Sequence, residues 1–366
     1  MVVPKVAVIC AGHNGNSGMY SVDLAAVRYF TSRNCNFDLY TAQENFDEPF
    51  KLDNVTVRFL QQELYDPSYT HIVYWGDFIN NPAYGYEDFA PRDVKLGNSP
   101  DINSAFDRWQ RLFNLSDGKP GAKVISVGNN FQNDLSHYAS RYPQVFDRMA
   151  DCFETILPRD PYSLQSLTMS LPRDTWPRIR QGMDCAFLLD APARPEPEDY
   201  FCYSFGRSKL PGVDKLVSEI EAATGLRGIK VRKWLKLRPK DAHQSFATSR
   251  NVISRSRFAL SDTYHFLINS MTQGVPVVAV GRSAREQVGT LGDFKKLTLL
   301  SMLGLEDRYV TFSDNTSSAD FIAKTKKTAV ATLDGNGSQS GSYRLMENLI
   351  HKFRSDLDFA LFGRRA

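Results

Sequence analysis

The sequence predicts an α/β protein made of two doubly wound domains, each built around a mainly parallel sheet. Three observations support this prediction. Strand-like and helix-like segments alternate along the chain, its 366 residues exceed the size of one ordinary core, and a proline-rich, charged stretch interrupts the alternation. That stretch is Asp190–Asp199, DAPARPEPED, which has the composition of an interdomain linker. We therefore expect an N-terminal domain over residues 1–190, a C-terminal domain over 195–335 and a helical segment over 341–366.

Hydrophobic periodicity predicts the elements of the first half, with short apolar runs as strands and apolar residues three and four apart as helices. The expected strands are Lys5–Cys10, Phe37–Ala42, Val55–Leu60, His71–Trp75, Lys123–Val127, Phe153–Leu157 and Ala186–Leu189. The expected helices are Met19–Phe30, Ile102–Phe113, Ser136–Met149 and Pro161–Met169. The segment Gly76–Pro91 is rich in Asn, Pro, Tyr and Asp, and we expect it to be a loop.

The second half repeats the alternation. Its expected strands are Tyr200–Phe205, Gly228–Trp234, Phe258–Leu260 and Pro276–Val280, and its expected helices include Val213–Thr224 and Pro239–Ser249. A further helix is predicted before the last strand, because Tyr264, Leu267, Ile268 and Met271 recur at the spacing of one buried helix face. Two such domains facing across a cleft form a ligand-binding architecture, and ligands of open α/β sheets bind beyond the carboxyl ends of the strands.

Composition excludes several classes of function. Lys and Arg number 44 and Asp and Glu number 41, so the net charge of +3 is too small to predict a nucleic acid partner. No stretch approaches the roughly 20 apolar residues of a transmembrane segment, and the N-terminus has the pattern of a first strand rather than of a signal peptide. Five scattered cysteines without a C-x-x-C pair argue against a disulfide framework and against a bound metal. We therefore expect a cytoplasmic protein.

The loop after the first strand, Gly12–Gly18 or GHNGNSG, is the first candidate for ligand binding. It matches neither the G-x-G-x-x-G fingerprint nor the P-loop, so no nicotinamide cofactor or ATPase site is expected, and no other cofactor is predicted. Asn14, Asn16 and Gly18 can still bring backbone N–H groups close to a ligand. A tight turn into the following helix is the alternative interpretation.

A second candidate follows the strand His71–Trp75. Trp75, Tyr84 and Tyr86 offer aromatic faces to a sugar ring, and Asp77 offers hydrogen bonds to hydroxyl groups, as do Asn80 and Asn81. The alternative interpretation is a folded surface loop whose aromatic side chains are buried.

The second domain contributes a cation and a histidine. Arg207 follows the strand Tyr200–Phe205 and can bind a carboxylate or phosphate with its planar fork, although an ordinary surface arginine is the alternative. If Asp262 is the N-cap of the next helix, His265 lies in the first turn, where free N–H groups favour an anion. His265 is off the apolar face and shares a stripe with Asn269 and Thr272. This position favours a functional histidine over a structural one.

In order and spacing, these motifs resemble those of the polysaccharide pyruvyl transferases, and the likeness covers most of the chain. The matching segments are Asn16–Gly18 for N-x-G, Arg159–Asp160 with Ser163 for R-[DE]-x-x-S, Asp184–Leu189, DCAFLL, at the end of the first domain, Thr263–His265 for R-L-H, Gly274–Pro276 for G-x-P, and Phe294–Val310. The resemblance implies two Rossmann-like domains arranged as in GT-B glycosyltransferases. It also implies transfer of a pyruvyl ketal from phosphoenolpyruvate to a sugar of a cell-surface polysaccharide.

The resemblance also implies roles for particular residues. His265 would contact the donor phosphate or act as a general acid, and Asp262 or another carboxylate would accept a hydroxyl proton. Arg207, Thr263, Tyr264 and Arg282 would bind the donor in the C-terminal domain. Asn14, Asn16, Gly18, Trp75 and Asp77 would belong to the N-terminal, acceptor side.

The family motif is broken at one position, because Thr263 replaces the arginine of R-L-H. A threonine cannot make the charged bidentate contact of an arginine. Either another cation, such as Arg255, Arg257 or Arg282, supplies the charge, or the donor is different. The alternatives are therefore a GT-B-like glycosyltransferase that uses a nucleotide-sugar donor and a non-catalytic glycan-binding member of the family.

Overall fold

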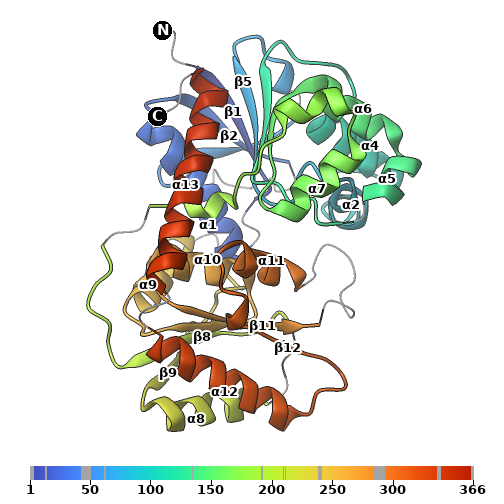
Figure 1. Ribbon diagram of the computed structural model, residues 1–366. Helices are drawn as coiled ribbons and strands as arrows, with labels where there is room; N and C mark the ends of the chain where they lie inside the picture. The colour runs from blue at the N-terminus through green and yellow to red at the C-terminus, as the bar shows by residue number, and fades with distance from the viewer. Residues whose placement is uncertain are drawn as a thin grey trace. The chain divides into compact units, whose positions relative to one another are not determined.

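The fold comprises two compact units, and each contains its own parallel sheet (Figure 1). The computed structural model describes residues 4–12, 15–42, 51–61, 63–133, 135–190, 193–208, 210, 212–237, 241–283, 293–335 and 339–363. The first unit consists of Met1–Asn14, Val22–Leu189 and Leu349–Ala366, and the second of Gly15–Ser21 and Asp190–Asn348. The predicted α/β class with two parallel-sheet domains is confirmed. Ala191 and Pro192 of the predicted linker lie outside the described residues.

The first unit is built on a seven-stranded sheet with the order β3-β4-β2-β1-β5-β6-β7. All neighbouring strands are parallel except the short β3, which runs antiparallel to β4. Every residue of β5 is buried, as expected of a central parallel strand that helices cover on both faces. The strands are β1 Lys5–Cys10, β2 Asn36–Thr41, β3 Lys51–Leu52, β4 Val55–Phe59, β5 His71–Trp75, β6 Lys123–Val127 and β7 Phe153–Leu157.

The helices of the first unit differ from the prediction at three places. The expected loop Gly76–Pro91 is largely helical, since Asn81 caps a turn that continues through a π-helical segment, Gly85–Phe89. The expected helix Ser136–Met149 is divided because Pro143 has no N–H to continue the first part. The expected strand Ala186–Leu189 is replaced by a 3₁₀ helix, Cys185–Leu188, which Asp184 caps. The α-helices are α1 Ser17–Ser32, α2 Pro82–Tyr84, α3 Ala90–Lys95, α4 Ile102–Asn114, α5 Leu135–Arg141, α6 Pro143–Cys152 and α7 Pro161–Ser170.

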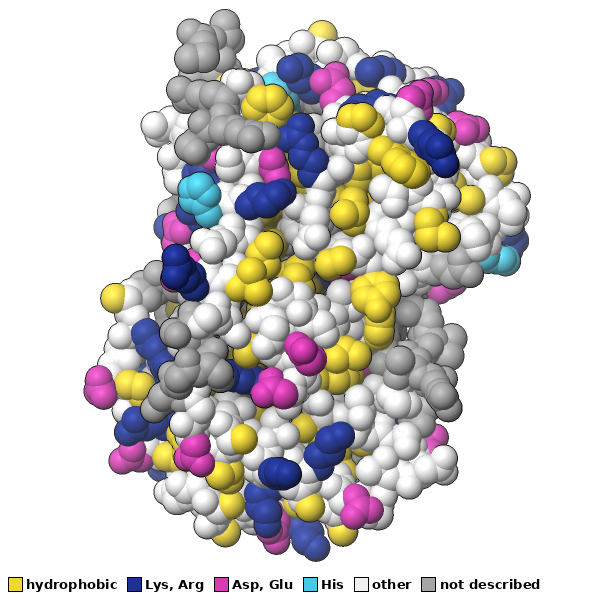
Figure 2. All heavy atoms as spheres, in the orientation of Figure 1, with side chains coloured by type: hydrophobic (Ala, Val, Ile, Leu, Met, Phe, Trp, Pro, Cys, Tyr) yellow, Lys and Arg dark blue, Asp and Glu magenta, His cyan; other side chains and the backbone are white. Residues whose placement is uncertain are grey.

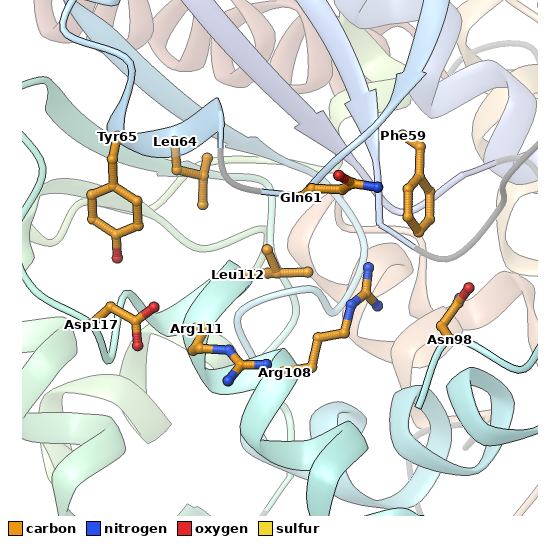
Figure 3. A pocket seen from close by; sticks show the side chains of 9 residues that line it. All are labelled: Phe59, Gln61, Leu64, Tyr65, Asn98, Arg108, Arg111, Leu112 and Asp117. Atoms are coloured by element: carbon orange, nitrogen blue, oxygen red, sulfur yellow. The ribbon is translucent and has the colours of Figure 1, made fainter. Parts of the chain in front are cut away.

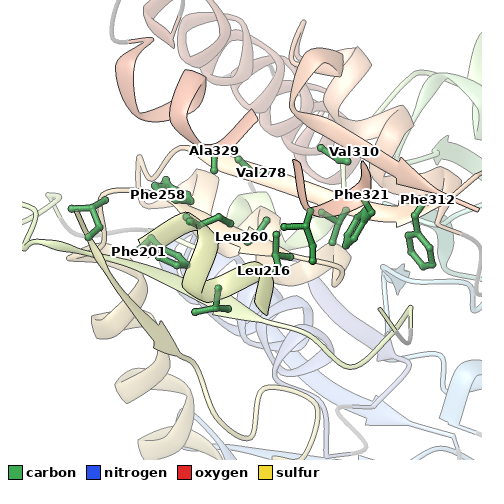
Figure 4. Close-up of a cluster of buried hydrophobic side chains, with 14 residues drawn as sticks. Phe201, Leu216, Phe258, Leu260, Val278, Val310, Phe312, Phe321 and Ala329 are labelled. Atoms are coloured by element: carbon green, nitrogen blue, oxygen red, sulfur yellow. The ribbon is translucent and has the colours of Figure 1, made fainter. Parts of the chain in front are cut away.

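The second unit is built on a five-stranded, all-parallel sheet with the order β12-β11-β10-β8-β9. Helices α8 and α12 cover one face and α9, α10 and α11 the other (Figure 1). Aromatic and aliphatic side chains of the strands pack against α8 and α12 in one buried cluster (Figure 4). The strands are β8 Tyr200–Ser204, β9 Arg227–Lys230, β10 Ala259–Ser261, β11 Val277–Arg282 and β12 Tyr309–Phe312. The helices are α8 Val213–Thr224, α9 Ala242–Ser254, α10 Tyr264–Thr272, α11 Phe294–Met302 and α12 Ser318–Asp334.

Two elements are shared between the units along the chain. The first turn of α1 belongs to the second unit, and the rest of α1 belongs to the first. The last helix, α13 Gln339–Phe362, divides in the opposite order at Leu349. Residues Arg238–Lys240, which include the start of the expected helix Pro239–Ser249, lie outside the described residues.

The surface shows no segregation of charge on the face seen in Figure 2. Lys and Arg side chains are interspersed there with Asp and Glu side chains. None of the helices in the described part of the chain combines the length and the apolar composition that a membrane span requires.

His71 makes the stability of the first unit depend on pH. It begins β5, is 7% exposed, and burial lowers its pKa to about 4. In the unfolded chain this histidine has an ordinary pKa of about 6.5, so below that pH the unfolded state binds a proton that the folded state does not. The free energy of unfolding should therefore be highest above pH 6.5 and fall as the pH drops toward 4. We expect the unfolding free energy of the protein to fall more steeply over this range than that of His71→Gln. Denaturant unfolding at several pH values measures both slopes, and equal slopes would contradict the prediction.

Candidate functional site

The candidate site lies at the carboxyl edge of the second sheet. The parallel strands β8, β10 and β11 are neighbours, so the segments that follow them meet at the same edge. Those segments carry Gly206–Ser208 after β8 and Asp262–His265 after β10, and Arg282 is the last residue of β11. Most of the residues that the sequence assigned to donor binding therefore gather at one edge of one unit.

Asp262 joins the segments that follow β8 and β10. Its Oδ2 accepts backbone N–H bonds from Gly206, Arg207 and Ser208 at 3.2, 2.8 and 2.7 Å. Its Oδ1 accepts the Thr263 hydroxyl at 3.1 Å, and the side chain is buried. A carboxylate with four such donors holds the backbone in place and has little capacity left to accept a substrate proton. The interpretation of Asp262 as a proton acceptor is therefore not supported by its surroundings.

The sequence favoured Asp262 as the N-cap of α10, but Asp262 is not at that position. Thr263 occupies the N-cap position, and its side chain makes no capping hydrogen bond. The backbone N–H of Thr263 is satisfied by the hydroxyl of Ser261, at 2.9 Å. The N-cap prediction was wrong because the strand order brings three backbone donors from the segment after β8 to Asp262, and its carboxylate binds these instead of capping α10.

A buried lysine that the sequence analysis did not identify stands behind this segment. Lys296 in α11 is 1% exposed; its Nζ donates to the backbone carbonyl of Asp262 at 2.6 Å and pairs with Asp293. Ser208 donates to both carboxylate oxygens of Asp293, at 3.1 and 3.0 Å. We call Ser208, Asp262, Asp293 and Lys296 the buried polar cluster.

The electrostatics of the buried polar cluster are set by desolvation. Burial lowers the pKa of Lys296 from its ordinary value, although the carboxylates of Asp293 and Asp262 oppose the shift. Arg207 lies close enough to lower the pKa of Lys296 further. A sequence signal for Lys296 existed, because it shares the helical stripe i, i+3, i+4, i+7 with Leu299, Leu300 and Leu303.

His265 lies in the first turn of α10, as predicted, but it is packed rather than free of contacts. It is 8% exposed, and a Cβ added to Gly18 would lie 2.6 Å from the Cβ and 2.8 Å from the Nδ1 of His265. Asn269, on the same stripe, donates to the Ser21 hydroxyl at 2.9 Å. The polar stripe of α10 thus faces the first turn of α1, so Gly18 is required for the approach of the two helices. Asn16 caps α1 there by accepting the Gly18 N–H at 2.8 Å.

The arginines considered as anion ligands fall into two groups. Arg207 is exposed, and among the described residues its guanidinium forms no ion pair. Arg282 lies 3.9 Å from Asp314 and over the ring of Phe312. Arg255 and Arg257 precede β10, at the amino edge of the sheet, where they pair with Glu198 and Asp199. They cannot supply the charge that Thr263 lacks, so this part of the expectation was wrong.

Thr263 and Tyr264 are poorly exposed for direct donor binding. Thr263 is 6% exposed, and its hydroxyl donates a hydrogen bond to Asp262. Tyr264 is 5% exposed and belongs to the apolar face of α10. Because the Thr263 N–H is already bonded to the Ser261 hydroxyl, the backbone N–H groups from Tyr264 onward, at the start of α10, are the part of this motif that suits an anion.

Of the three aromatic side chains predicted to face a sugar, Trp75 and Tyr84 are buried and Tyr86 is partly buried. Trp75 has no exposed surface and donates its indole N–H to the carbonyl of Val22 at 2.9 Å, so its assignment to sugar binding was wrong. Asn80 and Asn81 are buried and hydrogen-bonded to the backbone. Asp77 is partly buried, with a left-handed backbone at φ 55°. Asn14 lies outside the described residues.

Two of the quoted motifs of the first unit meet in a structural ion pair. Arg159 is 1% exposed and lies 3.5 Å from Asp160 and 3.4 Å from Asp184. Asp160 caps α7 through the N–H of Ser163. Within the described ranges, no group of three or more His, Cys, Asp or Glu side chains gathers as a metal site.

A cavity of about 610 Å³ lies in the first unit (Figure 3). None of the predicted site residues lines it. The lining side chains come from the end of β4, the segment that follows it, and α4 with its flanking loops. They are Phe59, Gln61, Leu64, Tyr65, Asn98, Arg108, Arg111, Leu112 and Asp117.

Comparison with solved structures places the fold in the GT-B class. The glycotransferase of kitacinnamycin aligns with a TM-score of 0.50 at 12% identity, over 99% of this chain and 100% of that chain. A putative UDP-N-acetylglucosamine 2-epimerase from Listeria monocytogenes aligns with a TM-score of 0.50 at 11% identity, over 98% of this chain and 97% of that chain. At such identities the likeness concerns the fold alone.

The sequence supplies the family. The model of the polysaccharide pyruvyl transferase family matches residues 54–284, which is more than half of the chain, so the protein belongs to this family. The resemblance inferred from the motifs is thereby confirmed. None of the curated proteins compared with the chain matches its sequence.

The buried polar cluster predicts a large coupling between Lys296 and Asp293. Lys296→Met should lower the free energy of unfolding by about 3–5 kcal/mol, because it leaves a buried carboxylate without its cation. Adding Asp293→Asn removes that charge, so the double variant should lose about 0.5–3 kcal/mol less than the sum of the single losses. Urea unfolding of the four proteins closes the cycle. Additive losses would show that the two side chains do not interact.

The contact between Gly18 and His265 predicts that Gly18→Ala displaces the imidazole. The added methyl group cannot fit at 2.6 Å from the His265 Cβ without a shift of one helix. Gly341→Ala is a matched control, since Gly341 is also helical and a Cβ there would meet nothing within 4 Å. We expect the His265 ring resonances to move in Gly18→Ala and to stay unchanged in Gly341→Ala. Unmoved resonances in both variants would rule out the contact.

Proposed function

We propose that this protein transfers the pyruvyl unit of phosphoenolpyruvate to two hydroxyl groups of one sugar in a cell-surface glycan or its precursor. Membership of the family supports a transferase that modifies polysaccharides. The choice of an anionic donor rests on Arg207. This arginine is exposed, its backbone N–H is bonded to Asp262, and it lies at the same sheet edge as His265. Phosphoenolpyruvate has a phosphate and a carboxylate, both of which suit an arginine fork.

The reaction balances without an external oxidant or reductant. One sugar hydroxyl oxygen bonds to C2 of phosphoenolpyruvate while the methylene carbon gains a proton and becomes a methyl group. The second hydroxyl oxygen then bonds to C2, and the C–O bond to phosphate breaks. The two hydroxyl protons are accounted for by the new methyl group and by the released inorganic phosphate. The products are the pyruvate ketal and phosphate.

Residues of the second unit have different roles in this reaction. Arg207 and the N-terminus of α10 bind the anionic donor. His265 donates the proton that the donor gains, or neutralises the leaving phosphate. Asp262 is a positioning residue, because it holds the backbone of Gly206–Ser208 rather than contacting the reacting atoms.

One observation favours a second candidate function. Thr263 stands where the family motif has an arginine, and its hydroxyl is directed to Asp262. The buried Lys296 does not replace that arginine, since its ammonium is occupied by Asp293 and by the Asp262 carbonyl. A nucleotide-sugar donor, or binding of a glycan without transfer, would be compatible with one cation fewer.

Variants of Arg207 and His265 test the proposed function. Phosphate release from phosphoenolpyruvate in the presence of oligosaccharide acceptors measures transfer. Arg207→Gln should lower kcat/KM for the donor roughly 10- to 100-fold, the effect of losing about 1.5–3 kcal/mol of charged hydrogen bonding. His265→Ala should lower kcat about 10²- to 10⁴-fold. Arg255→Gln, a charge loss at the opposite edge of the same sheet, should leave both constants unchanged.

Thermal unfolding in the presence of each ligand distinguishes the competing functions. Thermal stabilisation by phosphoenolpyruvate that disappears in Arg207→Gln supports the proposal, and saturating ligand at 100 times its Kd adds about 2.7 kcal/mol. Stabilisation by a nucleotide sugar alone would favour the glycosyltransferase. Stabilisation by oligosaccharides alone, without turnover of either donor, would identify a glycan-binding protein. Parental turnover in both Arg207→Gln and His265→Ala would place the site elsewhere.

A further inference from the structure

The cavity of the first unit has the volume and the lining of a ligand-binding site, although none of the predicted site residues lines it. Its volume of about 610 Å³ falls within the range of roughly 300–1,000 Å³ that small-molecule sites occupy. Figure 3 shows side chains from two directions around it, with Tyr65 and Phe59 from the segment around β4 on one side and Arg111 and Asp117 from α4 and the following loop on the other. The lining thus combines aromatic faces with hydrogen-bonding groups.

One wall of the cavity is fixed by Arg108. This arginine donates to Asp93 at 2.7 Å and to the backbone carbonyl of Ala42, just after β2, at 2.8 Å. Its guanidinium lies 5.3 Å from the centre of the Phe59 ring, at the end of β4. Because Ala42 and Phe59 mark the ends of parallel strands, this wall lies at the carboxyl edge of the sheet, where α/β proteins bind ligands.

The charges of the cavity balance, and this argues against an anionic ligand. Arg108 is neutralised by buried Asp93. The remaining charged lining residues are Arg111 and Asp117, one of each sign; both are exposed, and neither is in an ion pair with a described residue. A phosphate or carboxylate would meet as much repulsion as attraction in this site.

A neutral molecule with hydroxyl groups fits the same lining. The guanidinium of Arg111 offers donors, the carboxylate of Asp117 offers acceptors, and the amide of Gln61 offers both. Tyr65, at 40% exposed, presents an aromatic face that an apolar face of a sugar ring can cover. We propose that this cavity binds a saccharide, namely the part of the acceptor chain beyond the sugar that is modified. The identification of this saccharide as the acceptor rests on the proposed function, whereas the saccharide site itself does not.

Saccharide binding in the absence of any donor tests the site. Calorimetric titration of the full chain with di- to tetrasaccharides of glucose, galactose, mannose and N-acetylglucosamine should find at least one that binds with a Kd of about 1 mM or tighter. Tyr65→Ala and Arg111→Gln should each weaken that binding at least about tenfold, a loss of about 1.4 kcal/mol. Arg173→Gln, the same change at an exposed arginine of the same unit outside the cavity, should leave it unchanged. Tyr65→Phe keeps the ring and should keep most of the affinity.

Three results would overturn the saccharide site. They are the absence of saccharide binding at these concentrations, binding that survives in both Tyr65→Ala and Arg111→Gln, and displacement of the saccharide by inorganic phosphate. If Tyr65→Ala does not fold, Arg111→Gln alone decides, because Arg111 is exposed and makes no ion pair within the described residues.

Transfer kinetics separate this inference from the proposed function. With a long acceptor, Tyr65→Ala and Arg111→Gln should raise the acceptor KM about tenfold with kcat retained, and with a monosaccharide acceptor they should have no effect. Transfer with an unchanged acceptor KM in both variants would refute the acceptor role and leave the proposed function intact. Saccharide binding without any transfer would refute the proposed function and leave the saccharide site intact.

Discussion

The carboxylate of Asp262 is the constraint on which the candidate site depends. Three successive backbone N–H groups after β8 converge on one of its oxygen atoms, and the Thr263 hydroxyl occupies the other. A charge buried in this way is stable only where donors surround it, because a desolvated carboxylate without partners is too costly. The position of Arg207 and the start of α10 are therefore fixed together, by one side chain that need not contact a ligand.

The buried polar cluster separates structural charge from charge that is available to a ligand. Lys296 and Asp293 neutralise each other inside the unit and tie α11 to the backbone of Asp262. Arg207 remains exposed. Because the charge of Lys296 is balanced by Asp293 and its hydrogen bonds are already formed, the exposed arginine is the group that can form a bidentate contact with a ligand.

The two units offer chemically different surfaces. The second unit presents a cation, a histidine and a helix N-terminus, a combination suited to an anionic donor. The first unit presents a cavity in which charges cancel and aromatic rings remain, a combination suited to a neutral, hydroxyl-rich chain. Trp75 is buried, which shows that aromatic and polar residues after a strand do not by themselves form a sugar site.

The sequence alone determined the architecture, because helix and strand periodicities are local properties. Strands such as Lys5–Cys10 and helices such as Val213–Thr224 have the predicted bounds, and their alternation dictates parallel sheets. It also placed His265 in the first turn of its helix. Only the tertiary structure decided which partners these residues have: strand order brings Asp262 to the backbone after β8, and helix packing brings His265 to Gly18. Local periodicity can place Lys296 on a buried helix face, but it cannot identify Asp262 as its partner, since contacts between segments far apart in sequence depend on how sheet and helices pack.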